Sequence, residues 1–160
     1  MPYRFVDLTL TVDPKDTYVQ FPRDEIYGKP APGTIISPIA QLDVDHICNF
    51  GFETTTQSYT HYDAPYHFFH DGLKNDELPL DHVCGDACVL KVPGKENSEL
   101  VTAEDLEATG VEVRPGDIAI VSTEWTDRMW GSRDFWEHMV YLSTDAADWL
   151  IRKGIKAIVQ

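Results

Sequence analysis

The chain has 160 residues and a formal net charge of −14, from 27 Asp and Glu residues against 13 Lys and Arg residues. The surplus is even, because residues 1–80 and residues 81–160 each carry −7, and the sequence has no Lys/Arg cluster that could neutralise nucleic-acid phosphates or bind an anionic membrane. The length and the 42% hydrophobic content predict one folded domain and exclude an intrinsically disordered chain.

The compartment is predicted from the cysteines and the apolar runs. No run approaches the ~20 residues that a membrane helix needs, and the first residues lack the basic start and apolar stretch of a signal peptide. Three cysteines are an odd number, which favours a reduced protein over a disulfide framework. We therefore expect a cytoplasmic protein.

The first half of the chain has the pattern of strands separated by turns. Alternating side chains predict a strand over 3–10, and four prolines within 11–33 predict a long loop. Residues 34–44 and 50–63 are the next strand candidates, and Asp71-Gly72 marks a turn.

The second half alternates strands and helices. Three short apolar segments read as strands: 87–92, 118–121 and 155–159. Thr102 and Asp105 predict a capping box at the start of a first helix that ends at Gly110. Ser143 caps a second helix that ends at Gly154, with Ala146, Trp149 and Leu150 on its inner face. This order predicts an α/β domain with a mixed sheet.

A candidate metal site lies within 57–68. If residues 50–63 form one strand, side chains two apart share a face, which groups Gln57, Tyr59, His61 and Asp63. The imidazole of His61 and the carboxylate of Asp63 could then bind one divalent ion.

Pro65 would end this strand and let His67 turn back toward the same point, where it could take a proton from a metal-bound water. The same residues also fit an ordinary polar strand end. A third histidine nearby, His70, and the surrounding aromatic residues favour the functional interpretation.

The sequence Thr60-His61-Tyr62-Asp63-Ala64-Pro65-Tyr66-His67-Phe68 resembles the signature His-x-Gly-Thr-His-x-Asp-Ala-Pro-x-His-Phe of the cyclase family of metal-dependent hydrolases. That family includes bacterial kynurenine formamidase and isatin hydrolase. Weaker likeness extends over nearly the whole chain, as at Phe5–Thr9, Phe21–Asp24 and Gly85–Leu90.

The resemblance implies a single cyclase-like hydrolase domain over 1–160 with a swivelling β/β/α fold. It implies a divalent metal, with zinc as the first choice and manganese as the second. The implied reaction cleaves an amide, formamide or lactam-type bond in a small aromatic substrate, and the implied assembly is a homo-oligomer, either a dimer or a tetramer.

Each matched residue takes a role from the resemblance. His61 and Asp63 would be metal ligands, His67 the general acid and base, and Phe21 an aromatic wall for the substrate ring. Gln57 stands where the family has its first histidine ligand. Its carbonyl oxygen can bind a metal, although it is neutral and a weaker zinc ligand than imidazole.

Two departures qualify this prediction. Tyr59 replaces the glycine of the signature, and the sequence ends before a His and a Glu that complete a second metal site in the family. We therefore expect a single metal, a chain truncated at its C-terminus, or a site completed by another chain.

Two alternatives stay open. His61, Asp63 and a distant histidine such as His138 could form the two-His, one-carboxylate triad of a non-haem iron oxygenase. The chain could also be a non-catalytic family member that binds a ligand. Trp125, Trp130 and Trp136 are candidates for lining an aromatic pocket.

Overall fold

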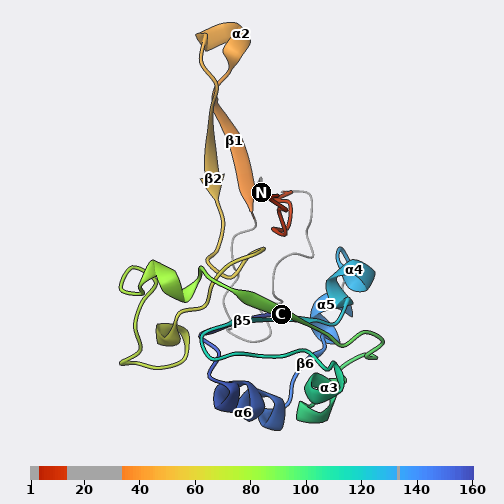
Figure 1. Ribbon diagram of the computed structural model, residues 1–160. Coiled ribbons are helices and arrows are strands. Elements are labelled where there is room, and N and C mark those ends of the chain that lie inside the picture. The colour runs from red at the N-terminus through yellow and green to blue at the C-terminus, as the bar shows by residue number, and fades with distance from the viewer. Residues whose placement is uncertain (1–3, 14–33, 133) are drawn as a thin grey trace. The chain divides into compact units, whose positions relative to one another are not determined.

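The structure is a computed structural model that describes residues 4–13, 34–132 and 134–160. The chain divides into two compact units, Met1–Tyr62 and Asp63–Gln160, whose helices and strands are labelled in Figure 1. None of the helices in the described ranges has the length and apolar character that crossing a bilayer requires.

Unit 1, Met1–Tyr62, contains a two-stranded antiparallel sheet. β1 (Ile35–Ala40) pairs with β2 (Asn49–Glu53), and the short helix α2 (Leu42–Asp45) lies in the connection at the end of the pair (Figure 1). The predicted strand over 34–44 is therefore right for β1 and wrong for α2. The helix forms there because the Gln41 carbonyl accepts from the amide of Asp45 at 2.8 Å, and the Asp45 carboxylate accepts from the amide of Gln41 at 2.8 Å.

The predicted strand over 3–10 is wrong in its described part, since residues 4–10 are irregular. The Asp7 carboxylate accepts from the amide and the hydroxyl of Thr9 at 2.9 and 2.7 Å, a local turn that competes with strand pairing. The amide of Leu10 donates to the hydroxyl of Thr60 at 2.9 Å and not to a neighbouring strand.

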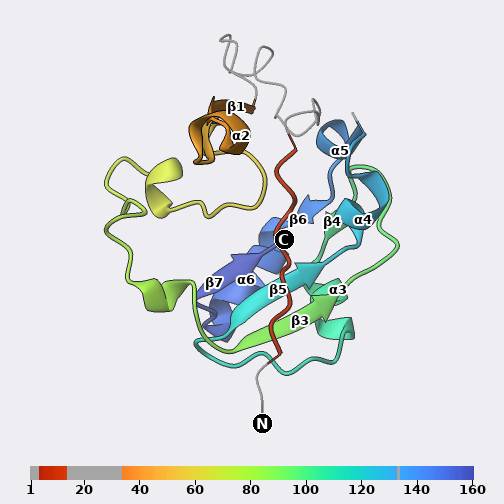
Figure 2. The ribbon, with the colours of Figure 1, turned by 90° about the horizontal axis from the view of Figure 1, so that it is seen from above.

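Unit 2, Asp63–Gln160, is built on a parallel three-stranded sheet with the order β3 (Ala87–Lys91), β5 (Ile118–Ser122), β7 (Ala157–Val159), seen in Figure 2. The three predicted strands of this half are confirmed. A second parallel pair joins β4 (Leu100–Val101) to β6 (Tyr141–Leu142). The expected mixed sheet is not found in the described part of the chain, because the antiparallel pair and the parallel pairs occupy separate sheets.

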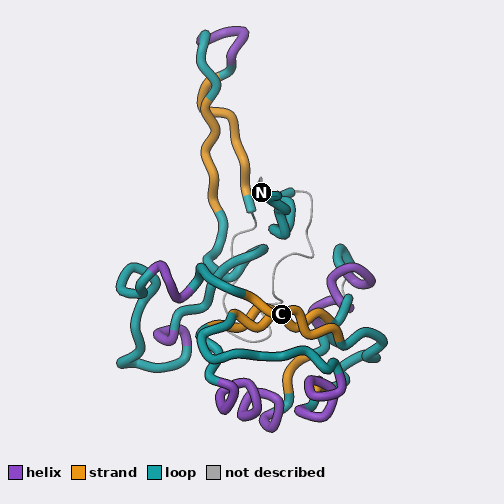
Figure 3. Tube along the Cα trace, viewed as in Figure 1, coloured by secondary structure: helices purple, strands orange, loops and turns teal. Residues whose placement is uncertain are grey.

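The helices of unit 2 are shown in purple in Figure 3. The α-helices are α3 (Ala103–Ala108), α4 (Trp125–Met129), α5 (Asp134–Glu137) and α6 (Thr144–Lys153), and the 3-10 helices are η1 (Pro65–His67) and η2 (Leu80–His82). Both predicted helix starts are confirmed. Thr102 and Asp105 form the capping box of α3, and the hydroxyl of Ser143 accepts from the amide of Ala146 at 3.3 Å at the start of α6.

The core of unit 2 lies between the sheet and α3 and α6, which Figure 1 shows on one side of it. Its most buried members are Leu90, Val101, Leu106, Ala119, Ala146 and Leu150. Trp125 also belongs to this core, and its indole N–H donates to the carbonyl of Phe135 at 3.1 Å, so it is not a pocket-lining residue. Trp130 and Trp136 are half-buried and pack edge-on against the Phe135 ring at centroid distances of 5.1 and 5.0 Å.

Candidate metal site

The segment from residue 54 to residue 64 carries most of the predicted ligands, but it is not a strand. β2 ends at Glu53, and the backbone of Tyr59 is left-handed, with φ of +57°. A left-handed residue breaks the alternation on which a strand face depends. The predicted strand over 50–63 is therefore wrong beyond Glu53, and so is the shared strand face of Gln57, Tyr59, His61 and Asp63.

Tyr59 occupies the position of the signature's glycine. A left-handed conformation costs a non-glycine residue about 1–2 kcal/mol, and glycine adopts it at no steric cost. The hydroxyl of Tyr59 donates to the carbonyl of Asp13 at 3.0 Å, which offsets part of this cost. The left-handed backbone gives a physical reason for the glycine of the signature, and Tyr59 keeps that conformation.

Gln57 and His61 lie together in unit 1 despite the loss of the strand. The Nδ1 atom of His61 lies 2.8 Å from the carbonyl oxygen of Tyr59, and because a carbonyl only accepts, Nδ1 carries the proton. Fixing one nitrogen of a histidine through a carbonyl is how proteins orient the other nitrogen toward a metal.

The donor atoms of these two residues fit a shared cation. Nε2 of His61 lies 3.2 Å from Oε1 of Gln57, within hydrogen-bond distance, so the two side chains lie side by side. Atoms bound to one ion at about 2.1 Å lie about 3.0 Å apart at a right angle and about 3.4 Å apart at the tetrahedral angle. The observed separation falls between these values.

Asp63 and His67 lie in unit 2, and His67 lies on a tight turn. The predicted turn at Pro65 is confirmed as η1, and His67 is its last residue. The carbonyl of Ala64 accepts from the amide of His67 at 2.8 Å, and the imidazole packs edge-on against the Phe68 ring at a centroid distance of 4.4 Å. Both side chains are exposed, so this imidazole can exchange protons with a bound molecule and with water.

Gly72 lies against the backbone of this turn. A Cβ atom at Gly72 would meet the carbonyl carbon of Pro65 at 2.6 Å and the amide nitrogen of Tyr66 at 2.7 Å. The turn is closed by the amide of Tyr66, which donates to the carbonyl of Leu73 at 3.1 Å. The Asp71-Gly72 turn signal located Gly72 in the sequence, but this close approach, and with it the role of Gly72 in holding His67, was missed.

The predicted site residues are therefore distributed over both units. Gln57 and His61 belong to Met1–Tyr62, and Asp63 and His67 belong to Asp63–Gln160. Phe21, the predicted aromatic wall, lies outside the described residues.

A second group of potential ligands lies at α5 in unit 2. Donor atoms of Asp134, Glu137 and His138 all lie within 4.8 Å of one another. Both carboxylates are exposed and the histidine is half-buried. Glu137 and His138 follow Asp134 by three and four residues, a spacing that indicates this cluster, although only His138 was predicted as a candidate.

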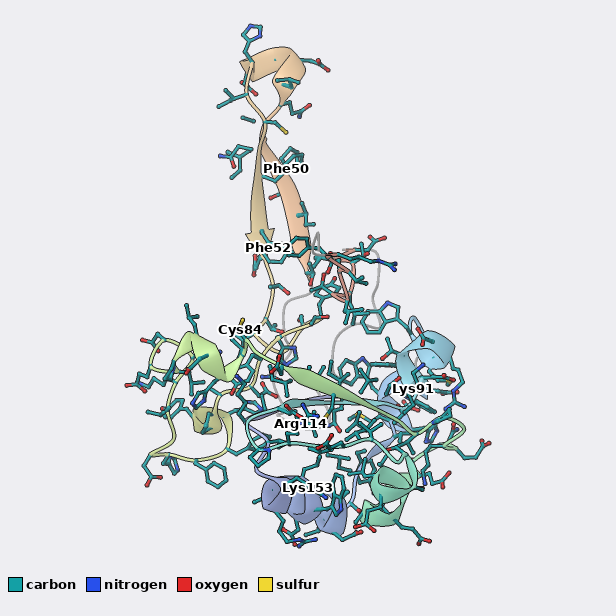
Figure 4. The ribbon with its side chains drawn as sticks, viewed as in Figure 1. Phe50, Phe52, Cys84, Lys91, Arg114 and Lys153 are labelled. Carbon is teal, nitrogen blue, oxygen red and sulfur yellow. The ribbon has the colours of Figure 1, made fainter. Side chains whose placement is uncertain are left out.

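A cavity of about 350 Å³ lies elsewhere in unit 2, and its lining contains none of the predicted site residues: Asp86, Ala87, Cys88, Glu112, Arg114 and Asp117. The Arg114 guanidinium, labelled in Figure 4, pairs with the Glu112 carboxylate at 2.8 Å. Burial, and secondly the charge of Asp117, raises the pKa of the Cys88 thiol, which makes it a poor nucleophile. This cavity therefore does not supply an activated thiol.

Comparison with known proteins gives a family and a fold. The sequence profile of the Cyclase family matches residues 6–160. An isatin hydrolase bound to the product analogue thioisatinate superposes with a TM-score of 0.73 at 25% identity, covering 94% of this chain and 63% of that one. Isatin hydrolase A from Labrenzia aggregata has a TM-score of 0.77 at 22% identity, and the match covers 97% of this chain and 66% of that one. At that identity the second comparison supports the fold alone.

Two further relatives extend this comparison. Isatin hydrolase A from Ralstonia solanacearum has a TM-score of 0.73 at 20% identity, with 96% of this chain and 64% of that chain covered. An uncharacterized protein of Haemophilus influenzae is 49% identical over 49 residues, which are 30% of this chain and 34% of that protein. The chain thus spans just under two thirds of the solved isatin hydrolases that it matches.

Proposed function

Since the chain belongs to the Cyclase family, we propose that it is a metal-dependent hydrolase that cleaves an amide, formamide or lactam-type bond in a small aromatic substrate. The observation that carries this proposal is the pair of donor atoms of His61 and Gln57, which face each other at 3.2 Å inside the signature segment. The likeness to an isatin hydrolase at 25% identity supports the same chemistry.

The proposed ligands are Gln57, His61 and Asp63. One imidazole nitrogen and two oxygens suit zinc, and the larger share of oxygen also makes manganese a reasonable occupant. When bound, the ion would acidify a water molecule and polarise the carbonyl group of the substrate.

His67 is proposed as the group that moves the proton. Its exposed imidazole would accept a proton from the attacking water and return it to the leaving nitrogen as the C–N bond breaks, which leaves His67 as it began. Phe21 is proposed to contact the aromatic ring of the substrate. The proposed role requires His67 to remain on the η1 turn, against which Gly72 packs so closely that an added Cβ atom would meet the backbone of Pro65 and Tyr66.

We expect residues 1–160 to act as one cyclase-like catalytic domain in the cytoplasm, and the three free cysteines, Cys48, Cys84 and Cys88, are consistent with a reducing compartment. A small-molecule substrate is the expected partner.

The test is a hydrolysis panel of aryl formamides, isatin and lactones, run with added zinc and with added manganese. We expect turnover of at least one substrate, and we expect His67→Ala to lower kcat by about 100-fold or more while the metal content is retained. His138→Ala is the matched control, because it removes a histidine outside the proposed site. Unchanged hydrolysis by His67→Ala would contradict the proposed role of His67.

The same preparation separates the two alternatives. Bound iron with oxygen-dependent turnover would indicate the non-haem oxygenase. A protein without metal and without turnover, even after metal addition, would indicate a ligand-binding family member.

A further inference from the structure

One lysine lies against the turn that carries His67. The ammonium of Lys74 lies over the ring of Tyr66, the residue before His67, with Nζ 5.3 Å from the ring centroid. A ring face attracts a cation within about 6 Å. The backbone on both sides of this lysine is also fixed. The carbonyl of Leu73 accepts from the amide of Tyr66 at 3.1 Å, and the carboxylate of Glu77 accepts from the amide of Lys74 at 2.9 Å. The positive charge is therefore held at the turn of the proposed general acid and base.

The ammonium of Lys74 keeps its hydrogen-bonding capacity for a ligand. A lysine has three N–H donors, and a ring face takes up the charge without an acceptor atom. Within the described ranges, Nζ of Lys74 forms no hydrogen bond and no ion pair. Lys95, in contrast, pairs with the carboxylates of Glu99 and Asp105, and Lys156 donates to two backbone carbonyls. Since Lys74 is exposed, its donors can reach a bound molecule.

Lys74 is also the one basic side chain of Lys or Arg type in an acidic segment. A chain with a net charge of −14 repels anions, and a positive charge in such surroundings directs an anionic group to its own position. An anionic ligand at the η1 turn would therefore be oriented by this residue. Residues 63–90 contain six carboxylates besides Lys74: Asp63, Asp71, Asp76, Glu77, Asp81 and Asp86.

The same turn presents aromatic rings to solvent. Phe68 and Phe69 are 77% and 65% exposed, and Tyr66 is half exposed. The Phe68 ring packs edge-on against the imidazole of His67 at a centroid distance of 4.4 Å. Large apolar side chains that are exposed together mark binding surfaces. A ligand with an aromatic ring and an anionic group matches these rings and the ammonium of Lys74.

We propose that Lys74 is a specificity-determining residue that binds the carboxylate of an aromatic ligand at the η1 turn, through a charge-assisted hydrogen bond from Nζ. This inference rests on the proposed function and adds an anionic group to its small aromatic ligand. The carboxylate has two sources. The substrate can carry it beside the bond that is cleaved, or hydrolysis can form it when a water oxygen joins a lactam carbonyl carbon and the C–N bond breaks.

The test compares formanilide, which is neutral, with the ortho, meta and para isomers of formamidobenzoate, which undergo the same reaction and carry a carboxylate. Lys74→Gln should raise KM for at least one formamidobenzoate about 10-fold at unchanged kcat, because a charged hydrogen bond is lost. Both constants for formanilide should stay unchanged, and Lys74→Arg should restore the KM of wild type. The matched control is Lys153→Gln, which should change no constant. Lys153 is an exposed lysine of α6 that also lies over a ring, that of Trp149, at 4.9 Å (Figure 4).

Isatin separates the two sources of the carboxylate, because it gains a carboxylate only when its ring opens. Dependence of the formamidobenzoate KM on Lys74 would assign this residue to a carboxylate of the substrate. Weaker inhibition of Lys74→Gln by the ring-opened product, with no change for formamidobenzoate, would assign it to the carboxylate that the reaction forms. An equal change for formanilide and formamidobenzoate would show a purely structural role and overturn the proposal, and so would a Lys74→Gln variant with every constant of wild type.

Calorimetric titration with the aminobenzoate isomers separates this inference from the proposed function. Aminobenzoate has no amide bond to hydrolyse, so Lys74→Gln should weaken its binding about 10-fold even in a protein that turns over no substrate. Hydrolysis by a wild type that binds no aminobenzoate would overturn the inference and leave the proposed function standing.

Discussion

Replacement of Gly72 by alanine should disturb the turn that carries His67. The new Cβ would lie 2.6–2.8 Å from three backbone atoms of Pro65 and Tyr66, where ordinary contacts begin at 3.4 Å. The shortfall is thus 3.4 − 2.8 to 3.4 − 2.6, or about 0.6–0.8 Å. Since backbone atoms have no alternative rotamer, the turn itself must move.

The cost has two parts. Forcing a methyl group into a packed site costs about 1–3 kcal/mol, and a movement of this size breaks the Tyr66–Leu73 backbone hydrogen bond, which adds about 1 kcal/mol. A total of about 2–4 kcal/mol lowers Tm by roughly 5–15 °C in a protein of this size. Misplacing His67 by a similar distance should reduce kcat by about 10–100-fold.

Differential scanning calorimetry and hydrogen exchange over residues 64–73 measure the structural part without reference to catalysis. Gly94→Ala is the matched control, because Gly94 has φ of +82° and a Cβ atom added there would meet no atom within 4 Å. This variant should lower the free energy of unfolding by only about 1 kcal/mol, from the left-handed backbone alone. If Gly72→Ala melts no lower than Gly94→Ala and keeps the exchange rates of wild type, the argument from close packing is refuted.

Three other predictions concern single contacts. Tyr59→Phe should lower the free energy of unfolding in urea by about 1 kcal/mol, because it removes the hydrogen bond to the Asp13 carbonyl. Tyr59→Gly should leave that free energy nearly unchanged, because relief of the left-handed backbone compensates for the lost bond. Equal losses in the two variants would contradict this prediction. Lys156→Met should lower the free energy of unfolding by about 2 kcal/mol and speed amide hydrogen exchange over 80–86, because Nζ donates to the carbonyls of Asp81 and Cys84 at 2.6 and 2.7 Å. Unchanged exchange would show that the ammonium does not hold this loop. Burial acts to raise the pKa of Asp105, but hydrogen bonds from Lys95 and Thr102 outweigh it and keep the pKa below its usual 3.8. The ionised carboxylate of Asp105 therefore stabilises the fold above its unfolded pKa, and this stabilisation is lost as pH falls through the lower folded pKa. Asp105→Asn should make the free energy of unfolding less dependent on pH in the acid range. An unchanged pH dependence in that range would exclude this role.

The second half of the chain could be predicted from sequence because its signals are local. The capping box of Thr102 and Asp105 and the cap at Ser143 act within one helical turn. The apolar runs of β3 and β5 pair with each other and bury Cys88, Leu90, Ala119 and Val121. Each signal agrees with the tertiary packing around it.

The segments 4–10 and 54–63 could not be predicted in this way, since their conformation depends on contacts between distant residues. Thr60 accepts from the amide of Leu10 and Tyr59 donates to Asp13, and these bonds replace the strand that the alternation around His61 suggests. The resemblance to the family signature also placed Gln57 and His61 in one site, independently of the predicted strand. Their proximity is confirmed by the 3.2 Å separation although the strand that was to produce it is absent.

The central claim is that His61 and Gln57 bind a divalent ion, and calorimetric titration of the metal-free protein with zinc tests it most directly. We predict one tight site per chain, weakened about 100-fold or more in His61→Ala, weakened less in Gln57→Ala, and unchanged in His138→Ala, whose neighbours Asp134 and Glu137 form the competing cluster. Zinc affinity that survives His61→Ala and is lost in His138→Ala would contradict the account and place the ion at α5.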